Sequence, residues 1–487
     1  MIGFPAARVP RRWKPNAAAV VFGAGILILN GCVVGPKYQR PTAQVPPAYK
    51  ENGNWKIAQP KDEKLAGNWW ELFGDPQLNT LEQQVNVSNQ NLKAAAAQYQ
   101  QALALLRYNR ANYYPTVTTS PSATRIRDAN NRPPENSIYS GITYNDFVFP
   151  VQLSYQADVW GRIRRTVEQY RDQAQASAAD LATVNLSMHA DLALDYFEAR
   201  TLDAEERLLN DTVAQYQQAL DLNRSLYQEG MASILTVQQA QTQLETTRAA
   251  AIDVGVLRAQ YEHAAAVLVG KPPENFSLPP LPLTTPPPPI PAGLPSDLLE
   301  RRPDIASAER MVAAANAQIG IATSAYYPII DLAATAGFES GSITTLFQGP
   351  GALWSFGPSA VATLFDFGRR RAVSDQAKAA YNQAMANYRQ TVLTGFQQVE
   401  DNLAALRVLE HEAEVESAAV TSAGAALDTS MTLFRGGLTS YLTVTTAQSA
   451  LLTDQVTAVN ILGRRMSGAV LLIQALGGGW DVSALKS

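Results

Sequence analysis

The sequence predicts a mainly α-helical chain with strands that cross a membrane, built from two copies of one unit. Each unit is expected to join a β-hairpin to a very long helical hairpin. Three observations predict this fold class: a repeat of constant spacing, two long proline-free stretches with helical periodicity, and short segments in which apolar and polar residues alternate.

The repeat is clearest in residues 227–241, YQEGMASILTVQQAQ, and residues 434–448, FRGGLTSYLTVTTAQ. Gly230 and Gly437 hold the same place in the two motifs and are 207 positions apart. The same spacing separates the motif DVWGR from the motif FDFGR. A spacing that holds over such a length without an insertion indicates a duplicated structural unit.

The N-terminus has the features of an export signal. A basic stretch and the apolar run 17–29 precede Asn30-Gly31-Cys32, which predicts a signal peptide over residues 1–31. Cys32 is the single cysteine, and the segment that ends there resembles the bacterial lipoprotein cleavage box. That resemblance implies a diacylglyceryl thioether and an acylated amine on Cys32. The alternative is an incidental cysteine in a conventionally cleaved or retained segment.

Composition divides the rest of the chain. Residues 32–74 are expected to form an extended, lipid-anchored N-terminal segment, and residues 75–270 the first copy of the repeat. Residues 271–295 are rich in proline and predict a semi-rigid linker. The second repeat is expected at 296–479, followed by a C-terminal tail at 480–487.

Each repeat is expected to begin with a helix. In the first, Asp75-Pro76 opens a helix that continues to about Tyr113, and Tyr114-Pro115 ends it, because proline disfavours helical geometry in the residue before it. In the second, the corresponding helix stops at Tyr327-Pro328. The two prolines are 213 positions apart, so a six-residue difference must be absorbed before the next matched segment.

Two strands are predicted after each of these helices. Residues 147–158 and 354–364 alternate between an apolar, aromatic face and a more polar face. Their expected partners, residues 116–127 and 329–340, alternate poorly. All four strands are about as long as a tilted strand needs to be to cross a bilayer, roughly 9–11 residues.

Very long helices are predicted next, over residues 162–227 and 369–434, because no proline interrupts them and apolar residues follow 3-4 spacing. At ~1.5 Å per residue each runs on the order of 100 Å. A return helix is expected to lead from each repeated motif to Gly270 or Gly477. The motif is thus the turn of a helical hairpin.

At these turns, Gly230 and Gly437 suit the left-handed position just past a helix end. Ser233 and Ser440 are expected to cap the return helices.

Four strands from one chain cannot close a barrel, and an open sheet edge in lipid leaves backbone groups unpaired at several kcal/mol each. The chain is therefore expected to form an oligomer. Two chains would supply eight strands, which leave little lumen, and three would supply twelve.

The chain resembles the TolC family of outer-membrane efflux proteins, in the lipoprotein branch related to NodT and OprM. The resemblance rests on GCVVGPKYQRP, NWWELFGDPQL, DVWGR, LPSDLLERRPDI, FDFGR and the two repeated motifs. It implies a homotrimer with a 12-stranded β-barrel and a 12-helix periplasmic α-barrel. It also implies a periplasmic adaptor (membrane fusion) protein and an inner-membrane pump of the RND type as partners.

The resemblance further implies that the periplasmic end of the tube closes at the hairpin turns. Many relatives carry an Asp at the position of Thr446, so this chain departs from an acidic ring and predicts a neutral, hydroxyl-lined constriction. Ordinary helix packing is the alternative role for Thr443 and Thr446. The residues expected at the periplasmic tip and gate are Tyr227, Glu229, Gly230, Phe434, Arg435, Gly437, Thr443 and Thr446.

No catalytic or nucleotide-binding constellation is present in the sequence, and no cofactor is predicted beyond the acyl chains on Cys32. His189, His263 and His411 occur singly without metal-ligand spacing and are expected to be packing or surface residues. The charges around Arg302 and Asp304 favour helix-end pairing over a partner contact. A net charge of −4 and a pI near 5.6 argue against a nucleic-acid partner.

The leading functional hypothesis is a passive exit duct for drugs or other small toxic molecules, anchored in the outer membrane by lipid and by the barrel, with a long periplasmic extension. It is not expected to be an enzyme. The alternatives are the outer component of a protein or peptide secretion system, and a non-conducting, lipid-anchored coiled-coil scaffold.

Overall fold

A computed structural model describes residues 33–42, 45–51, 67–127, 129, 141–290 and 297–485. The predicted signal peptide and Cys32 lie outside the described residues. The first copy contains η2 (Trp69–Phe73), α2 (Pro76–Ser88), α3 (Gln90–Arg110), η3 (Ala111–Tyr113), β1 (Thr116–Thr119), β2 (Ser122–Arg127), β3 (Thr143–Ala157), α4 (Arg162–Gln228) and α5 (Ile234–Leu268). The linker contains η4 (Pro273–Asn275). The second copy contains α6 (Leu298–Arg301), α7 (Pro303–Ser324), β4 (Ile329–Ser340), η6 (Ile343–Thr345), η7 (Gly349–Gly351), β5 (Ala352–Val361), α8 (Arg369–Arg435), α9 (Tyr441–Ala475) and η8 (Val482–Ala484).

The duplication predicted from the sequence is present in the elements themselves. Helices α4 and α8 each contain 67 residues, and α5 and α9 each contain 35. The starts of α4 and α8, like those of α5 and α9, are 207 positions apart. The starts of β1 and β4 are 213 apart, as the spacing of the two Tyr-Pro pairs predicted.

The chain forms two compact units. One unit holds the strands with the adjoining helix ends, and includes Leu103–Asp172 and Val312–Gln383 together with the lead segment up to Gln39. The other unit holds the two helical hairpins with α2, the linker and α6.

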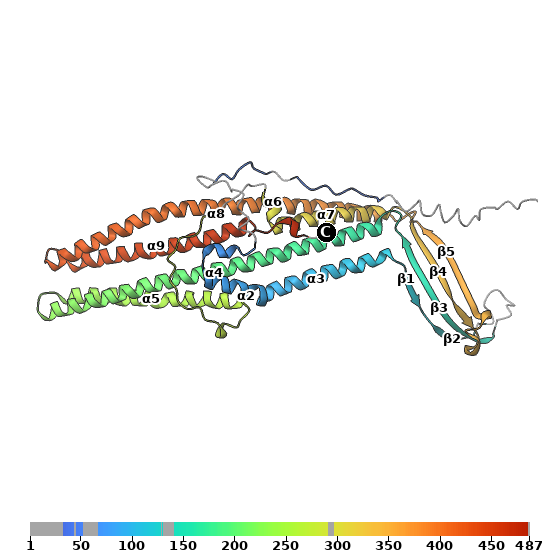
Figure 1. Cartoon of the computed structure of the whole chain (residues 1–487), viewed down its shortest axis with the longest axis horizontal. Coiled ribbons are helices and arrows are strands. Elements are labelled where there is room, and N and C mark those ends of the chain that lie inside the picture. Colours follow the sequence, from blue (N-terminus) through green and yellow to red (C-terminus); the bar gives the residue numbers. More distant parts are fainter. Residues whose placement is uncertain are drawn as a thin grey trace, which may run out of the picture. The chain divides into compact units, whose positions relative to one another are not determined.

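In the strand unit, all neighbouring strands are antiparallel and follow the order β1-β3-β4-β5, with β2 also paired to β3 (Figure 1). The two predicted hairpins therefore meet through β3 and β4, where Ala157 lies opposite Ile330. Among the described strands, β1 with β2 forms one free edge of the sheet, and β5 forms the other.

The predicted strand at 116–127 is divided at Ser120-Pro121. The gap faces Phe149 and Pro150 of β3, so two prolines that lack an N–H meet at this point and the ladder loses its donors. β5 ends at Val361, three residues before the predicted end.

The first predicted helix is likewise divided, at Asn89. Asp75 caps α2 by accepting hydrogen bonds from the N–H groups of Gln77 and Leu78, as expected. Asn89 has an extended backbone and starts a new helix, because its Oδ1 accepts the Leu92 N–H and its Nδ2 donates to the carbonyl of Leu268. The break thus ties α3 to the end of α5.

In the hairpin unit, α4 turns back as α5 and α8 turns back as α9 (Figure 1). Gly230 and Gly437 have φ values of 77° and 73°, which confirms the left-handed turns. Ser233 accepts a hydrogen bond from the Thr236 N–H, as predicted. The matching prediction for Ser440 is wrong: its side chain makes no cap, and its backbone carbonyl alone accepts the Thr443 N–H.

Helix α9 is the one described helix that is long and apolar enough to span a membrane by length and composition. Its apolar residues have another use in the fold. Ile461, Met466, Val470 and Ile473 are each at most 2% exposed and pack inside the hairpin unit. The apolar character of α9 is therefore explained by burial against neighbouring helices.

Candidate functional site: the helical hairpin tips

The two hairpins pack against each other near their turns. Tyr441 and Val444 of the second hairpin enter a buried cluster formed by the first. The members from the first hairpin are Tyr216, Leu220, Ala240 and Leu244. Val213, Val237, Leu427, Met431 and Phe434 pack around this cluster and are partly buried.

The two turns are not equivalent, although their sequences repeat. Tyr441 is 4% exposed, whereas Ile234, its counterpart 207 positions earlier, is 50% exposed. The ring of Phe434 lies 5.2 Å from that of Tyr441, and its own counterpart, Tyr227, is 46% exposed. Tyr441 was not among the residues predicted for the tip. The only signal in the sequence is the replacement of the first residue of ILTV by tyrosine in YLTV.

The structure places the predicted tip residues at the turns and brings only part of the set together. Phe434 contacts the buried cluster, whereas Tyr227, Glu229 and Arg435 remain exposed beside the two glycines. Glu229 is the single acidic residue in the two repeated motifs.

Thr443 and Thr446 are both exposed on α9 within the chain. The hydroxyl of Thr446 donates to the carbonyl of Leu442 at 2.8 Å, and the hydroxyl of Thr443 accepts from that of Thr439 at 2.9 Å. Thr445, between them, is 9% exposed. The side chain that packs is thus Thr445, and the predicted gating role of its two neighbours stays a prediction.

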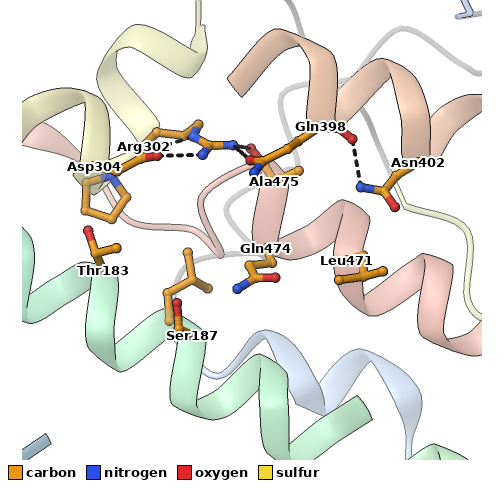
Figure 2. A pocket seen from close by; sticks show the side chains of 11 residues that line it. Thr183, Ser187, Arg302, Asp304, Gln398, Asn402, Leu471, Gln474 and Ala475 are labelled. Carbon is orange, nitrogen blue, oxygen red and sulfur yellow. Dashed lines mark hydrogen bonds and ion pairs between the residues drawn. The ribbon is translucent and has the colours of Figure 1, made fainter. Parts of the chain in front are cut away.

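A pocket of about 280 Å³ lies between α4, α8, α9 and the start of α7 (Figure 2). Arg302 lies at its edge and is 7% exposed. Its guanidinium binds both carboxylate oxygens of Asp304, and it also donates to Gln398 Oε1 at 2.8 Å and to the carbonyl of Ala475 at 2.9 Å. Ala475 ends α9, so Arg302 neutralises the negative end of that helix. This is the helix-end pairing favoured by the sequence.

A buried acid and imidazole lie elsewhere in the hairpin unit. His189 Nδ1 is 2.6 Å from Glu82 Oε2, and Trp70 stacks on the imidazole with 4.3 Å between ring centroids. Burial lowers the pKa of His189 to about 4 and raises the pKa of Glu82. His189 is therefore a packing residue, as predicted, but one with a buried polar partner that the sequence analysis missed. His411 is exposed, 3.5 Å from Glu414.

A row of carboxylates follows one face of α4. Asp191 and Asp195 are one turn apart, and Glu198 accepts a hydrogen bond from the Ser467 hydroxyl at 2.9 Å. Burial, together with Asp191 and Glu198, raises the pKa of Asp195 to about 6. In the part of the chain that the structure describes, no three His, Cys, Asp or Glu side chains are grouped as metal ligands.

A duplicated β-hairpin and helical hairpin, with a free edge on each side of the sheet, defines the class of outer-membrane channel subunits. The chain belongs to the outer membrane efflux protein family, whose model matches residues 81–270 and 294–478.

Known proteins of this class are similar over nearly the whole chain. The antibiotic efflux pump outer membrane protein ArpC of Pseudomonas putida is 32% identical over 455 residues, which cover 93% of this chain and 94% of ArpC. The cation efflux system protein CusC of Escherichia coli is 29% identical over 458 residues, covering 93% of this chain and 97% of CusC.

Solved structures agree. The outer-membrane channel OprN matches with a TM-score of 0.86 and 28% identity, over 92% of this chain and 100% of that chain. The Campylobacter jejuni CmeC outer membrane channel matches with a TM-score of 0.86 and 25% identity, over 93% and 96%. The predicted fold class is confirmed, and so is the predicted function: the protein is the outer-membrane channel component of an efflux system.

Proposed function

We propose that three copies of this chain form a passive duct through which small toxic molecules leave the cell. One observation carries this proposal: the described strands of each chain form a single sheet in the order β1-β3-β4-β5, with a free edge on both sides. In lipid the unpaired N–H and C=O groups of those edges would cost several kcal/mol each, so only a closed ring of chains satisfies them. Twelve strands enclose a lumen, whereas eight leave little room.

The duct works with two partners, a periplasmic adaptor protein and an inner-membrane pump of the RND type. The pump supplies the energy, since the sequence contains no phosphate-binding loop. Relatives are named for antibiotics, toluene and cations. The second repeated motif carries no carboxylate, which favours uncharged or organic molecules over cations as the exported compounds.

The chain is further proposed to be held by acyl chains on Cys32. The residues that follow Cys32 are bound to the short segment between β3 and α4 and to the start of α4. The Val34 N–H donates to the carbonyl of Trp160 at 3.1 Å, and the Arg165 guanidinium donates to the carbonyl of Pro36 at 2.9 Å. Val33, the residue next to Cys32 in the sequence, lies beside Gly161, four residues past the end of β3. This place near a membrane strand supports a lipid anchor at Cys32.

Deletion of the gene tests the proposal in cells. The deletion strain is expected to become hypersensitive to hydrophobic antibiotics, and the intact gene to restore resistance. Loss of a secreted protein without any change in susceptibility would instead support the secretion alternative.

The purified protein is expected to form trimers in detergent that conduct ions in planar bilayers, and a non-conducting trimer would favour the scaffold. Labelling with radioactive palmitate, with Cys32→Ser as the control, tests the lipid anchor.

A further inference from the structure

The junction between β3 and β4 shows how one copy of the repeat packs on the next. Trp160 lies three residues after the end of β3, and Tyr327-Pro328 directly precedes β4. The two aromatic rings stack with 4.9 Å between centroids and 27° between planes. The Trp160 indole also donates to the carbonyl of Pro328 at 2.8 Å. An aromatic residue on one copy therefore covers the Tyr-Pro pair of the other.

The same two surfaces recur at the free edges of the sheet, where the described part of the chain leaves them largely exposed. Phe367, 207 positions after Trp160, is 92% exposed. Tyr114, 213 positions before Tyr327, is 74% exposed and precedes Pro115. Phe367 thus presents an aromatic ring, as Trp160 does at the internal junction, and Tyr114-Pro115 presents a Tyr-Pro pair, as Tyr327-Pro328 does there.

The two β-hairpins of the chain pair their strands in the same register, so the register of the internal junction can be applied to the free edges. Partners in the first hairpin have residue numbers that add up to 270, and partners in the second add up to 690. The difference, 420, is the sum of the two spacings, 207 and 213, so the hairpins have the same internal register. Partners across the β3–β4 junction add up to 487.

Each β3 residue has a counterpart 207 positions later, and each β4 residue has one 213 positions earlier. Replacing the residues of the β3–β4 junction by these counterparts gives the register expected between the two free edges. In that register the residue numbers of opposite partners add up to 481. This register sets Tyr114 opposite Phe367. It also sets Val117 opposite Leu364, two apolar residues that are 62% and 92% exposed in the single chain.

We propose that β5 of one chain pairs with β1 and β2 of a second chain in this register, and that Phe367 of the first chain covers Tyr114-Pro115 of the second. Residues 362–364, which follow the end of β5, become strand on pairing, because their counterparts belong to β3. The inference rests on the proposed oligomeric channel and specifies its contact.

The junction between copies is chemically weaker than the internal one. Phenylalanine has no counterpart of the Trp160 N–H, so the carbonyl of Pro115 receives no indole hydrogen bond. Phe367 also has a φ of 51°, and it is the one non-glycine residue in the described part of the chain with a positive φ. The channel therefore separates between copies at this contact before the internal junction opens.

Four cysteine substitutions test the register with the full-length channel in its membrane. The pairs T118C with T363C and T119C with A362C are in register. Recombining the same four substitutions as T118C with A362C and T119C with T363C gives matched controls that are out of register. Opposite residues have Cβ atoms about 4.5–5.5 Å apart, and the shorter of these separations reaches the range of a disulfide. A shift of one residue turns the side chains to opposite faces.

Oxidation is expected to link copies covalently in at least one of the in-register pairs and in neither control, with single-cysteine variants showing the background. Two in-register pairs are used because adjacent pairs in an antiparallel ladder alternate in side-chain spacing. A stable oligomer that links in the controls but not in the in-register pairs would overturn the register alone. A wild-type protein that remains monomeric in detergent and under chemical cross-linking would overturn the proposed channel and this contact together.

The aromatic contact has its own test. F367A is expected to lower the temperature at which the oligomer dissociates in detergent. F367W is expected to raise it, since the indole can donate to the carbonyl of Pro115. An unchanged dissociation temperature in F367A, with the disulfides still forming, would overturn the role of Phe367 and leave the register standing.

Discussion

Glu82 Oε2 lies 2.6 Å from Nδ1 of His189, in a place where both side chains are almost completely buried. Trp70 stacks on the face of the imidazole, and Asn86 Oδ1 lies 3.1 Å from its Nε2. The contact joins α2 and η2 to the long helix α4, although Glu82 and His189 are 107 positions apart. A buried polar pair of this kind is costly to break, because the remaining partner keeps its desolvation cost.

His189→Ala is therefore expected to destabilise the protein by about 3 kcal/mol, the upper end of the cost of leaving a buried polar partner unpaired. His411→Ala is the matched control, since its side chain is 79% exposed and sits on the other long helix. Thermal unfolding followed by circular dichroism in detergent gives the comparison. Equal effects of the two substitutions would contradict a structural role for the Glu82–His189 contact.

The carboxylate row on α4 predicts a pH dependence of stability. The folded-state pKa of Asp195 is raised to about 6, above its unfolded value, so the charged form is disfavoured in the folded state. This penalty is fully present above pH 6 and disappears as the pH falls toward 4. Because part of the side chain is exposed, solvent screening leaves about 1 kcal/mol of it.

Asp195→Asn is accordingly expected to stabilise the protein by about 1 kcal/mol at pH 8 and to have little effect at pH 4. Thermal unfolding midpoints at the two pH values provide the measurement. A stabilisation that is the same at both would show that charge is not its cause.

The packing of Tyr441 predicts a difference between the two hairpin turns. Tyr441→Ala leaves a cavity between the hairpins and is expected to cost about 3–5 kcal/mol, as for other large aromatic truncations. A loosened tip should also raise the frequency of channel openings in planar bilayers. Ile234→Ala, at the equivalent but half-exposed position, is expected to change both quantities less. An equal effect of the two substitutions would rule out the asymmetry.

The composition of the second turn predicts how cations act on the channel. With threonine at positions 443 and 446, millimolar trivalent cations added from the periplasmic side are expected to leave single-channel currents unchanged. Thr446→Asp would place carboxylates around the constriction and is expected to introduce block, while Thr446→Asn serves as the uncharged control. Strong block of the wild-type channel would disprove the neutral constriction.

Much of the fold could be predicted from the sequence because its signals are local. Helical and strand periodicity, the Tyr-Pro pairs and the turn glycines act through neighbouring residues, so α4 and α8 end within one residue of the prediction. The constant spacing of 207 positions predicted the duplication, and the contact proposed between two chains is argued from that repeat.

Several features that the sequence analysis missed depend on long-range contacts. Asn89 divides a predicted helix because its side chain reaches Leu268, 179 positions away. The burial of His189 depends on Glu82, and that of Tyr441 depends on which face of α9 meets the first hairpin. The sequence by itself determined the elements, their order and their repetition. Only the tertiary structure decided which copies of a repeated residue are buried, because burial depends on packing partners that no local pattern specifies.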